Sequence, residues 1–238
     1  MKAYISVLIL CIAILISCKK DDNTHVMREG TYTNNSLATA GPITLYVGNK
    51  TITEKTFIHN FLERRINSWL TDSTFREQPG INTPFIFTSV TIRGDFAYYT
   101  LDPGNSYEDT FRINALSANT RLLVANTESI IKPTVTGELS CANVAKYVRR
   151  NPPTYACSYF NYPDSYCTGR KQLQLNVEDD HLVIPVLTYY FARPIAPGII
   201  CHTYERYISD DFNKDILSKL RSEDTLAVQT YFVKLYKQ

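Results

Sequence analysis

The sequence predicts a β-rich fold, between all-β and α+β, in which about 8 to 10 strands form a barrel or a sandwich accompanied by two helices. Short runs of β-branched and aromatic residues recur along the chain, and turns rich in glycine, proline and aspartate separate them. Only two segments space their apolar residues as a helix does. A hydrophobic fraction of 44% is enough for a core and excludes a disordered chain.

The first expected elements are a strand over 43–47 and a helix over about 54–70. The strand alternates polar and apolar residues and ends at a Gly-Asn turn. Thr53 occupies the N-cap position of the helix and Glu54 its first turn, and apolar residues then recur every three or four positions. This spacing predicts a helix face that packs on a sheet, in preference to a cofactor groove.

Two hairpins are expected further along the chain. The first joins 85–92 to 96–101 through an Arg-Gly-Asp turn, and the second joins 172–177 to 182–191 through an acidic turn. Pro185 lies within the second hairpin, and because proline cannot donate to a ladder, we expect its strand at a sheet edge or at a bulge. Further strands are expected over 110–113, 121–126, 129–132, 199–208 and 226–236.

A second helix is expected over about 210–220, between the last two strands. Ser209 or Asp210 precedes it as a candidate N-cap, and apolar residues recur within it at helical spacing. This order of strand, helix and strand at the end of the chain faintly resembles that of the lipocalins. The start departs from theirs, because the single tryptophan, Trp69, lies in the first helix and not in a Gly-x-Trp motif. The resemblance implies a small-ligand carrier with its site in the barrel interior, which is one alternative function.

The first 17 residues have the features of a secretory signal peptide. Lys2 precedes an apolar run over 5–16 that is short for a membrane span. The run ends in Leu15-Ile16-Ser17-Cys18, which resembles the lipobox of bacterial lipoproteins, and the Lys-Lys-Asp-Asp sequence that follows resembles outer-membrane and cell-surface lipoproteins of the Bacteroidota. The resemblance implies cleavage before Cys18 and its acylation, palmitate included. It also implies a lipid-anchored protein of the outer membrane that faces the cell surface, with the periplasmic face as the alternative.

Three segments follow from this interpretation. We expect a signal peptide over 1–17, a lipidated N-terminus and tether over 18–30, and a single β-rich domain over 31–238. The membrane, reached through the lipid anchor, is then the first expected partner.

Four cysteines remain after the signal peptide and Cys18 are set aside. They are Cys141, Cys157, Cys167 and Cys201, and an even number in an oxidising compartment indicates two disulfides. We expect Cys157 to pair with Cys167 around a short turn-rich loop and Cys141 to pair with Cys201. A zinc site is the weaker alternative, because no two of these cysteines lie two to four residues apart.

The chain offers little sign of chemistry. Its 25 basic and 23 acidic side chains leave a net charge of +2, which argues against a nucleic-acid partner. Glycine-rich phosphate loops, serine nucleophile elbows and His-Glu-x-x-His motifs do not occur. We therefore expect a non-catalytic protein with no cofactor and no metal, and keep a secreted hydrolase with scattered residues as a further alternative.

The candidate binding residues lie in the aromatic segment 147–167. Rings on a disulfide-closed loop offer contact area at low entropic cost and can stack on sugars. The alternative is a satellite core in which the same rings are buried. The expected function is thus a binding module for a glycan, a protein or a small apolar ligand, and its candidate contact residues are Tyr155, Tyr159, Phe160, Tyr162 and Tyr166.

Overall fold

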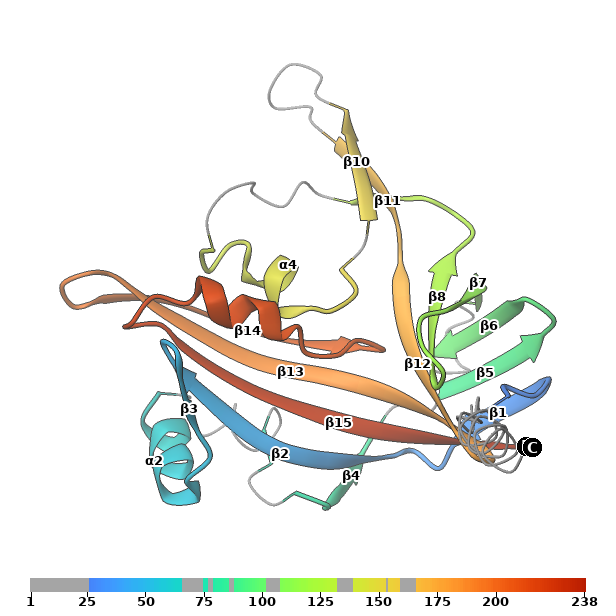
Figure 1. The fold of residues 1–238 in the computed structure, drawn as a ribbon, viewed down its shortest axis with the longest axis horizontal. Helices are drawn as coiled ribbons and strands as arrows, with labels where there is room; N and C mark the ends of the chain where they lie inside the picture. Colours follow the sequence, from blue (N-terminus) through green and yellow to red (C-terminus); the bar gives the residue numbers. More distant parts are fainter. Residues whose placement is uncertain are drawn as a thin grey trace, which may run out of the picture.

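Strands dominate the computed structural model of the chain (Figure 1), and three short helices accompany them among the residues that the structure describes. The strands form a closed eight-stranded antiparallel barrel, an open sheet that continues from it, and a small sheet of three strands. The prediction of a β-rich barrel with few helices is therefore confirmed. The structure describes residues 26–65, 75–76, 79–85, 88–101, 108–131, 139–152, 154–158 and 166–238.

The barrel is an up-and-down meander with insertions. Each of its strands pairs with the next barrel strand along the chain, and the last pairs with the first, where Tyr32 lies opposite Lys237. Its strands are β1 (Gly30–Asn34), β5 (Thr88–Arg93), β6 (Phe96–Leu101), β7 (Glu108–Ala115), β8 (Thr120–Ala125), β12 (Gln172–Glu178), β13 (His181–Ala196) and β15 (Thr225–Lys237).

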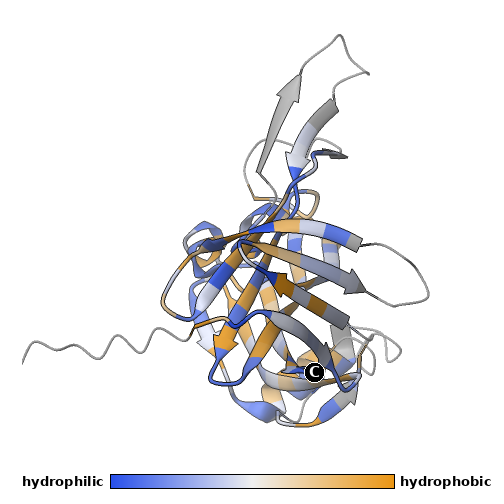
Figure 2. Ribbon diagram, turned by 90° about the vertical axis from the view of Figure 1, so that its right-hand side faces the viewer, coloured by the Kyte–Doolittle hydropathy of each residue, from blue (hydrophilic) through white to orange (hydrophobic). Residues whose placement is uncertain are grey.

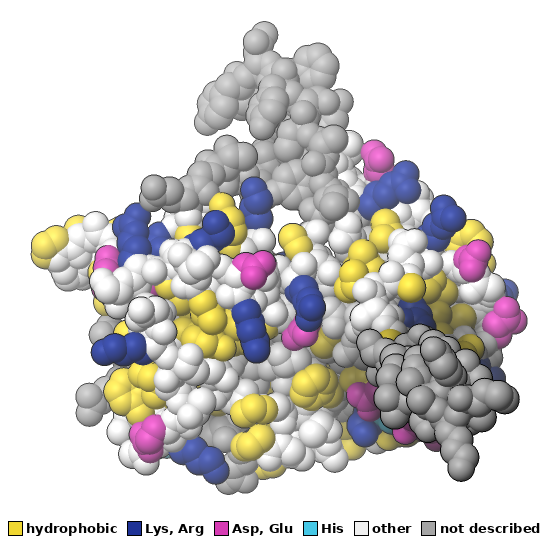
Figure 3. All heavy atoms as spheres, in the orientation of Figure 1, with side chains coloured by type: hydrophobic (Ala, Val, Ile, Leu, Met, Phe, Trp, Pro, Cys, Tyr) yellow, Lys and Arg dark blue, Asp and Glu magenta, His cyan; other side chains and the backbone are white. Residues whose placement is uncertain are grey.

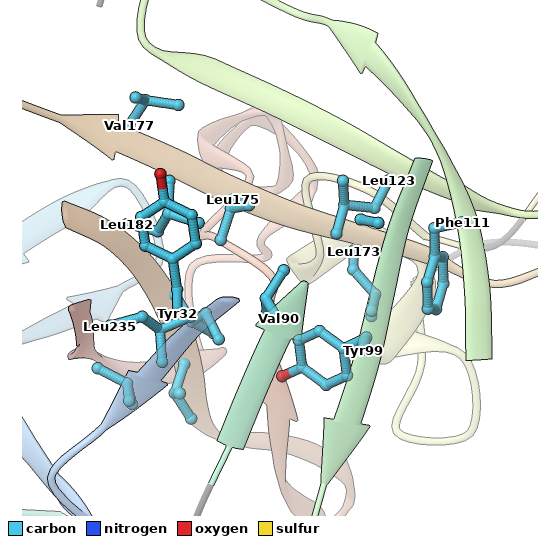
Figure 4. Packing of buried hydrophobic residues seen from close by; sticks show 14 of the residues in the cluster. Tyr32, Val90, Tyr99, Phe111, Leu123, Leu173, Leu175, Val177, Leu182 and Leu235 are labelled. Carbon is cyan, nitrogen blue, oxygen red and sulfur yellow. The ribbon is translucent and has the colours of Figure 1, made fainter. Parts of the chain in front are cut away.

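Side chains fill the interior of the barrel. Successive residues of a strand point to opposite faces, and the alternation of hydrophilic and hydrophobic residues along the strands can be followed in Figure 2. Phe111 is fully buried and Tyr99 packs against it edge to face, with the ring centroids 6.3 Å apart. Burial raises the pKa of Tyr99 to about 12. Figure 4 shows the inward side chains of this core in contact, among them Tyr32, Val90, Leu123, Leu173, Leu175, Val177, Leu182 and Leu235.

Two long strands, β13 and β15, belong to both the barrel and the open sheet. Beyond the barrel, β13 pairs with β14 (Ile199–Ile208) and β15 pairs with β2 (Leu37–Val47). The sheet ends with β3 (Lys50–Ile52) next to β2, and β4 (Asn82–Pro84) also pairs with β2. The barrel and the open sheet therefore share one continuous pair of strands.

Helices cover both faces of the open sheet. Helix α2 (Lys55–Arg65) places Ile58 and Leu62 against β2 and β13, which confirms its predicted core-facing stripe. Residues 66–70 of the expected helix lie outside the described residues. On the other face, α4 (Val144–Val148) and the 3₁₀ helix η1 (Lys214–Lys219) pack over Tyr189.

The caps predicted for the two helices were wrong. Thr56 N–H and Phe57 N–H donate to the carboxylate of Glu54, which therefore caps α2 in place of Thr53. The second helix is a short 3₁₀ helix that starts at Lys214, and Asn213 caps it by accepting the Asp215 N–H. Asp210 is instead fully buried and forms an ion pair with Arg149. A short carboxylate suits this role as well as it suits an N-cap.

Pro185 lies neither at a sheet edge nor in a bulge. It belongs to β13, which has neighbours on both sides, and it lies opposite Phe232 of β15. On the other side, the pairing with β12 ends at Val183 and the pairing with β14 begins at Val186. The proline therefore occupies the gap in which one neighbouring strand replaces the other, and no ladder there needs its missing N–H.

The small sheet projects from the rest of the molecule (Figure 1). It consists of β9 (Ser129–Ile131), β10 (Thr154–Ser158) and β11 (Tyr166–Arg170), in the order β10-β11-β9. In the β10–β11 ladder, Cys157 lies directly opposite Cys167. The backbone thus brings together the two cysteines that were expected to pair.

Candidate binding groove

The structure places only two of the five candidate ring residues. Tyr155 belongs to β10 and Tyr166 to β11, where they lie opposite Gly169 and Ser158. Tyr159, Phe160 and Tyr162 lie outside the described residues. The proposal that these rings bind a partner therefore stays a prediction.

The beginning of the aromatic segment packs against the body of the protein. Tyr147 lies on α4, at the edge of the core on that face of the sheet. The ammonium groups of Lys146 and Lys219 lie 5.8 and 5.3 Å from the centroid of its ring. This part of the segment matches the satellite-core alternative.

A groove of about 830 Å³ lies on the same face of the open sheet as α4 and η1. Strands β2 and β15 form its floor, and the segment that leads into η1 forms a wall. Its lining residues are Gly41, Pro42, Thr44, Tyr46, Arg150, Asp211, Phe212, Asn213, Lys214, Asp215, Val228, Thr230 and Phe232.

A bulge shapes the floor of the groove. The pairing of β15 with β2 shifts register between Gln229 and Tyr231, opposite Gly41. A Cβ atom on Gly41 would lie 2.6 Å from the carbonyl oxygen of Thr230, so the two backbones can approach this closely only at a glycine.

Backbone hydrogen bonds hold the wall in place. Arg150 N–H donates to the carbonyl of Asp211 at 2.9 Å, and Asn213 N–H donates to the carbonyl of Val148 at 2.9 Å. The Asp210 carboxylate accepts the N–H groups of Asn151 and Asp211 and the Nε of Arg149, at 3.1, 2.9 and 2.6 Å. The groove is therefore preformed by the fold.

The charges that line the groove balance, because Arg150 and Lys214 face Asp211 and Asp215. Arg150 Nη1 lies 3.6 Å from an oxygen of Asp211, and since both side chains are partly exposed, the pair adds little stability. Figure 3 shows hydrophobic side chains and charges of both signs close together on the face of the molecule drawn there. The groove is thus suited to a polar ligand without a large net charge.

Three aromatic rings contribute to the lining. Tyr46 and Phe212 stack with their centroids 5.6 Å apart, and Phe232 is exposed on β15. Tyr46 is itself buried, so Phe232 offers the most exposed ring face of the three. Such a ring, beside hydroxyl, amide and carboxylate groups, can stack on one face of a ligand while the edge of the ligand is hydrogen-bonded.

The sheet separates Cys201, His202 and Glu205, three titratable residues that lie close together in the sequence. Cys201 forms a disulfide with Cys141, which confirms one predicted pair. His202 stacks on Tyr190 on the face that α2 covers, with the ring centroids 6.2 Å apart. Glu205 contacts the Tyr189 hydroxyl on the opposite face, and desolvation raises the pKa of Glu205. The three residues therefore do not form a site together.

Sequence reasoning missed the groove, because its residues come from distant segments. The one local signal was Gly41-Pro42 inside a run of β-forming residues, which is typical of a bulge.

Within the described ranges, no three His, Cys, Asp or Glu side chains are grouped so that they could hold a metal ion. In the same ranges, every helix is too short or too polar to cross a bilayer. Comparison of the chain with protein-family models, curated proteins and solved structures yields no match.

Proposed function

We propose that this protein is a lipid-anchored, non-catalytic binding module whose groove between β2, β15 and residues 211–215 takes a neutral glycan. The observation that carries the proposal is the lining of the groove, in which aromatic rings stand beside balanced charges and amide and hydroxyl groups. Sugars present an apolar face for stacking and an edge of hydroxyl groups for hydrogen bonds, so a glycan matches both parts of this lining.

The filled barrel bears on the alternative of a small-ligand carrier. The inward side chains, from Val90 on β5 to Val233 on β15, are buried against one another. An apolar ligand inside the barrel would have to displace this packing, at a cost of the order of the core's own packing energy. The groove, which is open to solvent, needs no such rearrangement.

The groove is tested by glycan binding to the purified chain. Phe232→Ala removes an exposed ring, so we expect an unchanged melting temperature but binding weakened by about 1 to 2 kcal/mol, or roughly 5- to 30-fold. Phe57→Ala is the matched control, since Phe57 is also exposed but lies on α2, on the other face of the sheet. A panel of neutral oligosaccharides in which none binds, or equal losses for both variants, would contradict the proposal. Hydrolysis of a bound oligosaccharide would favour the hydrolase alternative.

The anchor is proposed from Leu15-Ile16-Ser17-Cys18, which lies outside the described residues. Cys18→Ala should abolish acyl labelling and release the protein from the membrane fraction. Label retained on this variant would contradict the lipobox. Replacement of Lys20, Asp21 and Asp22 by alanine should leave acylation intact and reduce cleavage by protease added to whole cells, if these residues direct surface export.

A further inference from the structure

The end of the β13–β14 hairpin is an uncharged apolar extension. Residues 194–200, with the sequence Pro-Ile-Ala-Pro-Gly-Ile-Ile, are all exposed. The exposed fractions of Ile195, Ile199 and Ile200 are 62%, 55% and 39%. Isolated exposed apolar residues are common, but a continuous run of this length is typical of a contact surface.

The hairpin extends well beyond the rest of the sheet. The pairing of β13 with β15 ends at Ala192, opposite Thr225, whereas the pairing with β14 continues to Ala196, opposite Ile199. Four further residues correspond to about 13 Å of extended chain. The hairpin forms the left end of the ribbon in Figure 1, and hydrophobic side chains lie at the same end in Figure 3.

Two strong constraints fix the base of the hairpin. Arg193 and Cys201 lie opposite each other in the ladder, directly before and after the apolar run. The buried guanidinium of Arg193 binds both carboxylate oxygens of Asp224 and donates to the carbonyl of Leu139. Cys201 is linked to Cys141 by the disulfide. The extension is thus held rigidly to the body of the protein.

The backbone of the extension carries fewer donors than an ordinary hairpin. Pro194 and Pro197 have no N–H group, and the ladder between β13 and β14 reaches Ala196 and Ile199 at the turn. The pairing with β15 ends at Ala192 and β14 is an edge strand, so the outer edges of the tip still need water. Water reaches such groups in the headgroup region but not in the hydrocarbon core, which limits insertion to the interfacial region.

From these features we propose that the tip of the β13–β14 hairpin, residues 194–200, inserts into the interfacial region of a lipid bilayer. An extension of about 13 Å reaches past the depth of about 5 to 10 Å at which apolar faces lie below the headgroups. The exposed Tyr204 and His202 follow on β14, at the level where amphipathic rings favour the interface. The insertion does not depend on the glycan groove, which lies elsewhere on the sheet.

The proposed anchor and the tip lie at opposite ends of β13. Val26 lies beside His181, 15 residues before Ala196 on this strand, which corresponds to about 50 Å of extended chain. The chain from Cys18 to Val26 can span at most about 28 Å, so an acylated Cys18 and the tip can contact one bilayer only if β13 lies obliquely to it. The experiment therefore uses the chain from residue 19 onward, because the 18 residues removed belong to no described element and carry the acylation site.

The test is flotation of this chain with vesicles of phosphatidylethanolamine and phosphatidylglycerol. The wild-type chain should float with the vesicles, and Ile199→Asp should weaken partitioning by about tenfold or more, because a carboxylate is strongly disfavoured below the headgroups. Leu116→Asp is the matched control, since Leu116 is 49% exposed at the β7–β8 turn and should tolerate the change without loss of binding. Equal melting temperatures for the variants show that folding is retained.

A second measurement locates the tip directly. Ile199→Trp should show blue-shifted emission with vesicles, and brominated acyl chains should quench it more strongly than they quench the parent chain, which carries only Trp69. Absence of vesicle binding by the wild-type chain would overturn the proposal, as would equal losses for Ile199→Asp and Leu116→Asp. A dimer in sedimentation that Ile199→Asp dissociates, without vesicle binding, would assign the tip to a second copy of the chain and would also overturn it.

Discussion

The main-chain N–H of Asp210 donates to the carbonyl of Pro185 at 3.2 Å, at the point where β13 exchanges β12 for β14. Within one strand residue, the nitrogen and the carbonyl point to the same side. The ring nitrogen of Pro185 therefore faces the same gap, and Asp210, directly after β14, supplies the one donor that the gap needs. Its carboxylate then binds Arg149, so this residue joins the branch point of the sheet to α4.

Asp210→Asn should lower the free energy of unfolding by about 2 to 4 kcal/mol, because the Asp210 side chain is fully buried and Arg149 would lose its counter-charge. The amide oxygen can still accept the N–H groups of Asn151 and Asp211, so the loss reports mainly on the charge. Urea denaturation measures it. Asp215→Asn, an exposed carboxylate on η1, should change stability by less than about 0.5 kcal/mol. Equal losses of stability for the two variants would contradict a stabilising role of the ion pair between Asp210 and Arg149.

Arg193→Lys tests whether geometry or charge holds the base of the hairpin. Lysine keeps the positive charge but cannot bind both oxygens of Asp224 and the carbonyl of Leu139 at once. We expect a loss of about 2 kcal/mol or more in thermal or chemical unfolding, as when a buried partner is left unsatisfied. A variant as stable as the wild type would show that charge alone is sufficient.

Cys141→Ser with Cys201→Ser should destabilise the protein by about 2 to 4 kcal/mol, because the disulfide closes a long loop in the unfolded chain. Denaturation of the double variant, beside wild type in reducing buffer, measures the loss. The free energies of unfolding of the double variant and of the reduced wild type should agree if this bridge dominates. A larger loss on reduction would indicate the contribution of a second bridge.

Cys157 and Cys167 should form that second bridge, since the β10–β11 ladder places them opposite each other. Peptide mapping without reductant should recover a peptide that links the two, and no free thiol. A linkage from either residue to Cys141 or Cys201 would contradict both the register and the pairing.

Glu205→Gln should stabilise the protein at pH 8 and have little effect near pH 3. Desolvation raises the pKa of Glu205 in the folded protein, so folding is favoured while this carboxyl is protonated. The resulting stabilisation is complete below the pKa of Glu205 in the unfolded chain and is lost as the pH rises through its pKa in the folded protein. Glutamine is uncharged at every pH and avoids this loss. Because Glu205 is exposed, we expect a small rise in melting temperature, measured across pH. A lower melting temperature of the variant than of the wild type at pH 8 would contradict this prediction.

The sequence was most informative where local pattern determines the structure. The alternating run at 172–177 and the turn after it appear as β12 and the start of β13, because the alternation of one strand already shows which face is buried. The disulfide between Cys141 and Cys201 followed from the compartment and from the short loop assigned to the other two cysteines.

Long-range relationships were not accessible in this way. Asp210 matched an N-cap because aspartate is favoured there, but its ion pair with Arg149 joins segments 61 residues apart. Pro185 suggested an edge strand. Its position in the interior of the sheet could not be predicted, because the branching that accommodates it depends on three strands at once. The groove combines parts of β2, β15 and the segment before η1, and no window of sequence contains all three.

The ladder that closes the barrel has a consequence for the order of folding. It joins Tyr32, Thr33 and Asn34 of the first strand to Leu235, Tyr236 and Lys237 of the last described strand. During synthesis or export from the N-terminal end, β1 must therefore wait with one edge unpaired until β15 has emerged. A chaperone that shields exposed strand edges would act in that interval, and a truncation only a few residues before Leu235 would leave the meander unable to close.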